Sequence, residues 1–248
     1  MSQRQALVTG AGRNAGQGIA LALADAGYAV AVNDLHADRA AQTVELIRGN
    51  GGTARAAAFD VTDSAAVRSA VAELGDIDIL VNNAGVSEAF RQGPFLKSSP
   101  QDWHVQFDLN LFGSMTLIHA VLPGMVARRW GRVVQISSGA ASKGMNIGVS
   151  LYAASKAGIE GLLRHVANEV APSGVTVNAL ELGMMDNTIE AAGGPDSPGA
   201  KQIVAAIPVG RAGLPSDVGG AARWLCSDAG DWVTGQVIHL NGGALNGR

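Results

Sequence analysis

The chain has 248 residues, of which 47% are hydrophobic and 16% charged, and its formal net charge of −3 comes without a basic run that would indicate nucleic-acid binding. A single cysteine excludes an internal disulfide framework, and the five scattered histidines lack a metal-binding spacing, so we expect no metal. No signal-peptide pattern and no apolar run of the ~18 residues that cross a membrane are present, so we expect a cytoplasmic protein without a membrane partner.

The first predicted unit is a strand, a glycine-rich turn and a helix. The apolar strand Gln5–Thr9 leads into the turn Gly10–Gly18, and an amphipathic helix follows up to Gly27. Small residues there let the backbone approach a pyrophosphate, with the N–H groups of the helix pointing at it. A tight turn without a ligand would read the same way, so the following elements must decide.

An acidic residue follows the second predicted strand, Tyr28–Asn33. Asp34 comes 18 residues after Gly16, where a carboxylate can accept both hydroxyls of an adenosine ribose and repel a 2′-phosphate. A helix N-cap is the alternative reading of this residue. Arg13, in the glycine-rich turn, favours the opposite preference because a guanidinium can pair with a 2′-phosphate. We weigh Asp34 more heavily and predict NAD rather than NADP.

Polar residues also follow the next strands. The predicted elements are the helix Ala37–Gly49, the strand Ala54–Phe59, the helix Ser64–Leu74 and the strand Ile77–Val81. Asp60 comes after the third strand, and Asp63 is the predicted N-cap of the helix behind it. The fourth strand leads into Asn82–Gly85, whose amides either brace neighbouring backbone or line a cofactor cleft.

The predicted helix from Pro100 to Arg129 is long and is expected to break near Pro123-Gly124. It carries Asn110 in its middle, and asparagine is a poor helix former. The side chain of Asn110 is therefore either exposed or buried and hydrogen-bonded.

Tyr152 and Lys156 stand four residues apart at the start of a helix predicted to run to Ala171. At that spacing both side chains lie on one face, and the lysine charge is expected to lower the pKa of the phenol from about 10. Such a phenol exchanges a proton with a substrate oxygen more readily. An ordinary first helical turn would read the same way. Ser138, at the end of the strand Arg132–Ile136, is expected to bond the same substrate oxygen.

The remaining elements complete an alternating pattern of strands and helices. They are the strand Val175–Ala179, a loop from Gly183 to Pro208, the helix Pro215–Cys226 and the strand Gln236–Leu240. The pattern predicts a single Rossmann-like domain, a doubly wound, seven-stranded parallel sheet with helices on both faces. The polar groups then converge on one edge of that sheet.

The chain resembles the short-chain dehydrogenase/reductase family over essentially its whole length. The matching motifs are Thr9-Gly10 with Gly16, Asp60, Asn82–Gly85, Asn110, Ser138, Tyr152 with Lys156, and Asn178. The resemblance implies hydride transfer between a nicotinamide cofactor and an alcohol or ketone. It also implies a homotetramer, built partly on the helices that span Pro100–Arg129 and Ala153–Ala171.

The resemblance assigns a role to each matching residue. Tyr152 is the general acid/base, Lys156 lowers its pKa and holds the nicotinamide ribose, Ser138 orients the substrate oxygen, and Asn110 supports a water in a proton relay. The residues implied to bind the cofactor are Gly10, Arg13, Asn14, Ala15, Gly16, Asp34, Leu35, Asp60, Val61, Asn82, Ala84, Gly85, Tyr152, Lys156, Gly183 and Thr188.

The sequence departs from the family pattern at three places. Asn14 replaces the middle glycine of the turn, although asparagine tolerates a positive φ better than most residues. Leu182 replaces the usual proline before Gly183, and Glu181 before it either contacts a polar substrate or faces solvent. Thr188 comes one residue later than the family threonine that meets the carboxamide. The substrate lid is expected over residues 184–208.

The leading hypothesis is an NAD-dependent alcohol dehydrogenase or ketone reductase acting on a small or medium secondary alcohol. An alternative is an NADPH-dependent 3-oxoacyl-thioester reductase, because Arg128, Arg129 and Arg132 resemble a patch that docks an acidic carrier protein. A third hypothesis is a non-catalytic, cofactor-binding relative, although the Ser, Tyr and Lys are all present.

Overall fold

The computed structural model describes residues 3–85, 92–191 and 193–244. Its centre is an all-parallel, seven-stranded sheet in the order β3-β2-β1-β4-β5-β6-β7. The strands are β1 (Gln5–Val8), β2 (Ala29–Val32), β3 (Ala54–Ala56), β4 (Ile79–Asn82), β5 (Gly131–Ser138), β6 (Val175–Leu182) and β7 (Val237–Leu240). The predicted Rossmann-like fold is therefore confirmed.

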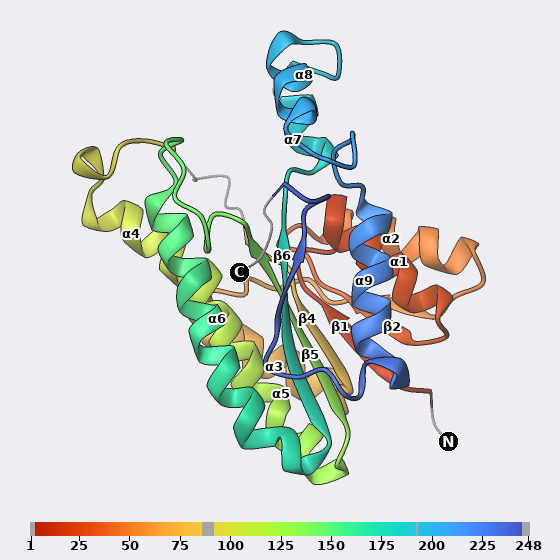
Figure 1. Cartoon of the computed structure of the whole chain (residues 1–248). Helices are drawn as coiled ribbons and strands as arrows, with labels where there is room; N and C mark the ends of the chain where they lie inside the picture. The colour runs from red at the N-terminus through yellow and green to blue at the C-terminus, as the bar shows by residue number, and fades with distance from the viewer. Residues whose placement is uncertain (1–2, 86–91, 192, 245–248) are drawn as a thin grey trace.

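Helices cover both faces of the sheet (Figure 1). The α-helices are α1 (Asn14–Asp25), α2 (Ala37–Gly49), α3 (Ser64–Leu74), α4 (Pro100–Phe107), α5 (Ser114–Arg128), α6 (Ser150–Val170), α7 (Asp186–Ala191), α8 (Pro198–Ala205) and α9 (Pro215–Cys226). Short 3-10 turns are η1 (Phe95–Lys97), η3 (Ala171–Ser173) and η4 (Asp228–Gly230).

Alternation along the strands explains the two layers of helices. In β1, Ala6 and Val8 pack in the core formed with α1, α2 and α9, whereas Leu7 packs in the core formed with α3, α5 and α6. Successive side chains of a strand point to opposite faces, so an apolar strand needs cover on both sides. All three of these residues are fully buried.

Strands β5 and β6 run further than the apolar pattern predicts. We expected them to end at Ile136 and Ala179, but pairing continues through Ser137 with Glu181 and Ser138 with Leu182. Backbone hydrogen bonds do not require apolar side chains, so the ladder extends past the point where hydrophobicity stops. Conversely, β3 ends at Ala56 instead of Phe59.

The long helix of residues 100–128 breaks at Asn110 and not near Pro123-Gly124, where we expected it. A π-helical segment, η2 (Asp108–Gly113), joins α4 to α5. The Nδ2 of Asn110 donates to the carbonyl oxygen of Gln106 at 3.1 Å, one turn earlier in the helix. Length and apolar composition alone would let this helix cross a membrane, but Leu117 is buried against the sheet.

The segment after β6 contains two short helices, where we expected a loop from Gly183 to Pro208. Helices α7 and α8 project from the body beyond the carboxyl ends of the strands (Figure 1). They have a small core of their own, formed by Ile189, Ala200 and Ala212. This arm rises from the edge of the sheet at which the predicted polar residues gather.

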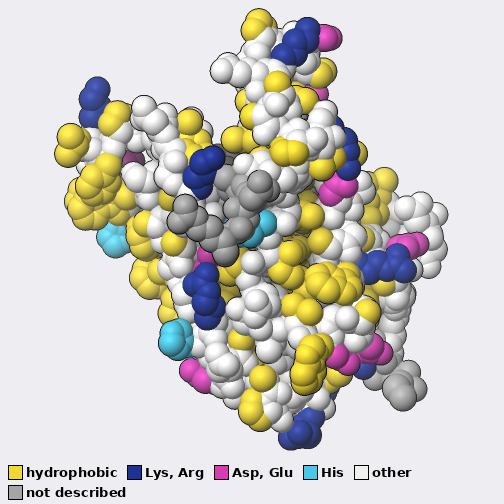
Figure 2. All heavy atoms as spheres, viewed as in Figure 1, with side chains coloured by type: hydrophobic (Ala, Val, Ile, Leu, Met, Phe, Trp, Pro, Cys, Tyr) yellow, Lys and Arg dark blue, Asp and Glu magenta, His cyan; other side chains and the backbone are white. Residues whose placement is uncertain are grey.

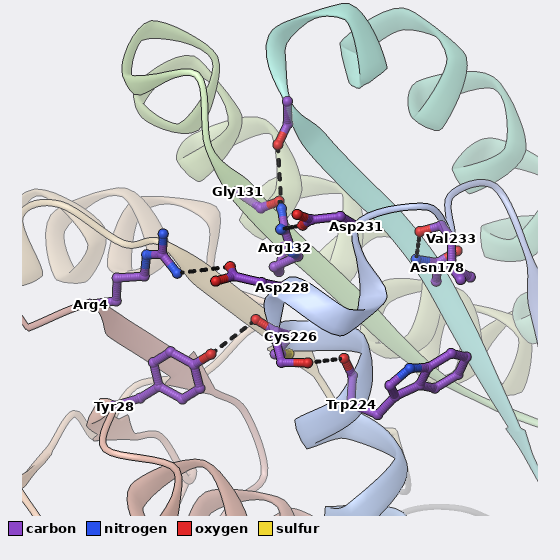
Figure 3. Close-up of polar contacts among 12 residues, drawn as sticks. Arg4, Tyr28, Gly131, Arg132, Asn178, Trp224, Cys226, Asp228, Asp231 and Val233 are labelled. Carbon is purple, nitrogen blue, oxygen red and sulfur yellow. Dashed lines mark hydrogen bonds and ion pairs between the residues drawn. The ribbon is translucent and has the colours of Figure 1, made fainter.

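A polar network lies toward the other end of the strands, away from the end at which the predicted polar residues gather (Figure 3). The buried guanidinium of Arg132 pairs with Asp231 and lies 4.2 Å from the centre of the Trp130 ring. Asn178 donates to the carbonyl oxygen of Val233 at 2.7 Å and so fixes the chain that enters β7. These contacts hold the C-terminal segment onto the sheet, away from the candidate site.

Candidate active site

The glycine-rich turn forms a tight cradle at the start of α1. Gly10 has a φ of +57°, and Asn14 takes a left-handed φ of +50°, so the turn tolerates asparagine as expected. A Cβ at position 16 would lie 2.1 Å from the carbonyl oxygen of Gly10, so only glycine fits there. Arg13 is exposed at the N-cap of the helix. With no side chain at Gly16, an anionic ligand can approach the backbone of this turn at the N-terminus of α1, where an anion is stabilised.

Asn83 braces this turn, which is one of the two roles expected for the amides of Asn82–Gly85, although Asn83 was not among the predicted cofactor-binding residues. Its Nδ2 donates to the carbonyl oxygens of Thr9 and Gly10 at 3.0 and 2.9 Å, and its backbone N–H donates to Thr9 Oγ1 at 3.0 Å. The buried Asn82 donates to the carbonyl oxygen of Ser114 at 3.4 Å, away from the cradle. Two adjacent asparagines after a strand were the available signal, but only the tertiary structure separates their roles.

Asp34 is fixed beside the cradle. Its Oδ2 accepts from the backbone N–H of Gly12 at 3.1 Å, and its Oδ1 accepts from that of His36 at 3.0 Å. The side chain is buried. Leu35 next to it is exposed, and so is Asp60, whose carboxylate bonds Thr62. The carboxylate of Asp34 therefore has a defined position where β2 leaves the sheet.

Three consecutive residues of β5 contact three residues of α6 that are spaced one turn apart. The carbonyl oxygen of Ile136 accepts from Lys156 Nζ at 2.8 Å, and Ser137 Oγ lies 2.5 Å from Glu160 Oε1. The side chain of Ser138 hydrogen-bonds Tyr152. The strand end and the helix are thus joined at the three predicted catalytic residues Ser138, Tyr152 and Lys156.

Burial raises the pKa of Tyr152, and the hydrogen bond from Ser138 offsets only part of that rise. The predicted lowering of this pKa by Lys156 is not present in this structure. Lys156 Nζ lies 5.7 Å from the centre of the Tyr152 ring and bonds Ile136 instead. The sequence shows the spacing of the two groups, but not the loss of water around the phenol.

Lys156 and Asn110 meet at Gly85. A Cβ at position 85 would lie 2.8 Å from Lys156 Nζ and 3.0 Å from Asn110 Oδ1. Both side chains are buried, and burial lowers the pKa of Lys156 to about 8. The Oδ1 of Asn110 has no hydrogen-bond partner among the described residues. A buried acceptor of this kind is suited to bind a water molecule.

A pocket of about 260 Å³ opens beside Tyr152. Its lining includes Gln92 and Lys97 before α4, Gln106 on α4, and Ser150 at the start of α6. The lining comes from residues 92–106 and from residues 148–152, and none of its residues belongs to α7 or α8. A separate hollow is visible between the α4 side of the molecule and the projecting arm of α7 and α8 (Figure 2). The phenol of Tyr152 therefore lies beside a space for a small molecule.

The residues after β6 lie at the base of the arm. The N–H of Gly183 donates to the carbonyl oxygen of Leu240 at 3.0 Å, which ties this turn to β7 in spite of the missing proline. Thr188 lies exposed on α7. Glu181 is buried and does not face solvent; its Oε1 accepts from Ser142 Oγ at 2.9 Å and lies 2.7 Å from His239 Nδ1.

Known proteins share this fold and much of this sequence. A family model described as enoyl-(acyl carrier protein) reductase matches residues 10–244. The 3-oxoacyl-[acyl-carrier-protein] reductase FabG of Staphylococcus aureus is 36% identical over 245 residues, which are 97% of each chain.

Solved structures of related proteins, among them two that hold a nicotinamide cofactor, are also similar to the whole chain. A gluconate 5-dehydrogenase from Burkholderia cenocepacia, in complex with NADP and tartrate, has a TM-score of 0.88 and 34% identity, and the match covers 98% of this chain and 96% of that one. A 3-oxoacyl-[acyl-carrier protein] reductase from Brucella melitensis with bound NAD has the same TM-score and identity, and the match covers 98% and 91%.

Proposed function

The chain belongs to the short-chain dehydrogenase/reductase family and is an oxidoreductase that works with a nicotinamide cofactor. We propose that it interconverts a secondary alcohol and a ketone, with Tyr152 as general acid and base. The observation that carries the proposal is the bonded group of Ser138, Tyr152 and Lys156 beside a pocket. A structural helix turn alone would not need a buried phenol and ammonium there.

The proposed chemistry moves one proton through Tyr152. In the oxidative direction, Tyr152 first releases its own proton toward solvent, after which its oxygen takes the hydroxyl proton of the alcohol while the carbon loses its hydrogen as a hydride, which leaves a ketone. A nicotinamide cofactor held by the glycine-rich turn and Asp34 would supply the hydride acceptor for oxidation and the hydride donor for reduction. Ser138, which bonds Tyr152, orients the reacting oxygen.

Lys156 and Asn110 are proposed to pass the proton onward. The buried Oδ1 of Asn110, which has no partner in the described part of the chain, lies near the same glycine as Lys156 Nζ, and a water held there would bond both groups. Asn110 is kept in place by its bond to Gln106 and by the π-helical turn. This arrangement supports a relay from Tyr152 through Lys156 to solvent.

We propose that the glycine cradle and Asp34 hold NAD in preference to NADP. The cradle has room only for backbone at Gly16, which suits a pyrophosphate, and the carboxylate of Asp34 is available to ribose hydroxyls. Asp60, Val61, Asn82, Ala84, Gly183 and Thr188 are proposed to complete the cofactor site. Related structures hold either cofactor, and the exposed Arg13 is the group that would favour NADP.

The pocket supports a small alcohol with polar and apolar parts as substrate, because its lining also includes Phe95, Val105 and Leu151. The side chains of Gln92, Lys97 and Ser150 line it and have no hydrogen bond or ion pair within the part of the chain that the structure describes. Such free donors recognise hydroxyl or carboxylate oxygens. The similarity to a gluconate 5-dehydrogenase supports the same class of substrate, a polyhydroxylated acid.

Reduction of a 3-oxoacyl thioester is the second candidate, because the curated FabG relatives carry that name. The three arginines that were expected to dock an acidic carrier protein, Arg128, Arg129 and Arg132, support this candidate less than the sequence suggested. Arg132 is buried against Asp231, and Arg128 pairs with Asp76 and Asp78. Arg129 remains exposed for an acidic carrier protein.

We also propose a cytoplasmic homotetramer assembled partly on α4, α5 and α6. The exposed apolar residues Phe112, Met115 and Val126 on this helical surface support a contact with a second copy.

The test is a screen of secondary alcohols and polyhydroxylated acids with NAD⁺, in which the wild type is compared with Tyr152→Phe and Ser138→Ala. We expect NADH formation by the wild type and a fall in kcat of at least about a hundredfold in Tyr152→Phe. A loss of only a few-fold would show that Tyr152 is not the acid and base. Activity confined to 3-oxoacyl thioesters would favour the second candidate.

A further inference from the structure

Two buried residues beside the site have no part in the proposed proton transfer. Ser137 on β5 and Glu160 on α6 are 2% and 5% exposed, and their side-chain oxygens lie 2.5 Å apart. Ser137 directly precedes Ser138. Glu160 lies on the same helix as Tyr152 and Lys156, two turns and one turn further on. The contact therefore joins the two elements that carry the reacting groups.

A carboxyl group at position 160 is expected to contribute little to the stability of the folded chain. Burial raises the pKa of Glu160, the bond from Ser137 lowers it, and the nearby Glu181 raises it again. Its cationic neighbours are Arg164, which lies 3.6 Å away and is 54% exposed, and the buried Lys156, whose pKa the carboxylate of Glu160 raises. An apolar side chain would fill such a site without desolvating a charge. Buried carboxyls with these surroundings gather at functional sites.

We propose that Glu160 is a positioning residue, which through Ser137 fixes Ser138 against Tyr152 and Lys156. This inference rests on the proposed function. The peptide bond links Ser137 to Ser138, so a side chain that holds Ser137 to α6 also limits how far Ser138 moves from the phenol. Displacements of about 1 Å between reacting groups cost as much as a hundredfold in rate.

Glu181 holds the loop between Ser138 and Tyr152 in the way that Glu160 holds Ser137, by a side-chain hydrogen bond. It is paired in register with Ser137 across β5 and β6, and with His239 across β6 and β7. Its carboxylate accepts from Ser142 Oγ at 2.9 Å, so the buried side chain tethers the loop that leads from β5 to α6. Three neighbouring strands therefore share a polar layer that contacts the middle of α6 through Glu160.

The experiment compares Ser137→Ala, Glu160→Leu, the double variant and the conservative Glu160→Gln. Glu169→Leu is the matched control, because Glu169 is an exposed glutamate on the same helix. Steady-state kinetics, NADH binding by tryptophan fluorescence and thermal unfolding are measured for each chain. We expect Ser137→Ala and Glu160→Leu each to lower kcat about tenfold with KM for the cofactor within about twofold.

The double variant should lose no more than either single variant, because both remove one contact. Glu160→Gln keeps the hydrogen bond and should recover most of kcat, and Glu169→Leu should match the wild type. A lower unfolding midpoint with unchanged kcat would overturn the inference, as would equal losses in Glu160→Gln and Glu160→Leu. An inactive wild type would overturn the proposed function together with it, whereas an active wild type with active variants would overturn the positioning role alone.

Discussion

Lys156 Nζ donates to the carbonyl oxygen of Ile136 at 2.8 Å, at a buried point where α6 crosses the end of β5. The bond anchors the ammonium in a site that disfavours its charge, because burial lowers the pKa of Lys156 from 10.5 to about 8 and the carboxylate of Glu160 restores only part of it. Burial of the Lys156 ammonium therefore lowers the stability of the folded chain, so we infer that Lys156 is kept at this position for its function.

The first prediction concerns pH and Lys156. In the unfolded chain the lysine keeps its proton up to about pH 10.5, whereas in the folded chain it loses it near pH 8. The unfolded state therefore binds more protons between these values, and the free energy of unfolding should rise with pH across that window. A difference of this size corresponds to on the order of 3 kcal/mol.

Lys156→Met should remove this rise and unfold at a higher temperature than the wild type at pH 7, while its kcat is lost. Thermal unfolding of both chains from pH 7 to 10.5 measures the difference. Parallel curves for the two chains across that range would contradict a lowered pKa of Lys156.

The second prediction concerns Asp34 and the cofactor. Asp34→Ala should weaken NADH binding by about tenfold, the loss of one hydrogen bond to a charged group, and should improve NADPH binding relative to NADH. Fluorescence titration with both cofactors measures the two affinities. Arg13→Ala is the control and should leave NADH affinity unchanged. A wild type that binds NADPH as tightly as NADH would remove the argument from Asp34.

The third prediction concerns Asn110. Asn110→Ala removes the buried acceptor Oδ1 and the bond to Gln106, so kcat should fall by at least about tenfold while the chain remains folded. Stopped-flow kinetics and circular dichroism test the two parts. If kcat stays at the wild-type level, Asn110 has no role in the proton relay.

The fourth prediction separates stability from activity. Asp231→Ala leaves the buried guanidinium of Arg132 without its carboxylate and should lower the free energy of unfolding by about 1–3 kcal/mol. The pair lies at the amino end of β5, opposite to Ser138, so kcat at a temperature where both chains are folded should not change. Chemical denaturation and steady-state assays test it, and a reduced kcat would reveal coupling across the sheet.

The order of the elements was accessible from the sequence because its causes are local. Apolar runs, turn residues and N-caps such as Asp63, which accepts from Ala65 and Ala66, depend on a few neighbouring residues. The glycine spacing and the pair Tyr152 and Lys156 are local in the same sense. These signals predicted the parallel sheet, the edge with the polar groups and the conformation of Asn14.

Other properties depended on residues far apart in the chain, and only the tertiary structure decided them. The lengths of β5 and β6 follow from their pairing with each other, and the role of Asn83 follows from the approach of β4 to the glycine-rich turn. The raised pKa of Tyr152 follows from desolvation, which no spacing in the sequence records. The contact of Glu160 with Ser137 joins residues 23 positions apart, and packing of α6 on the sheet alone brings them together.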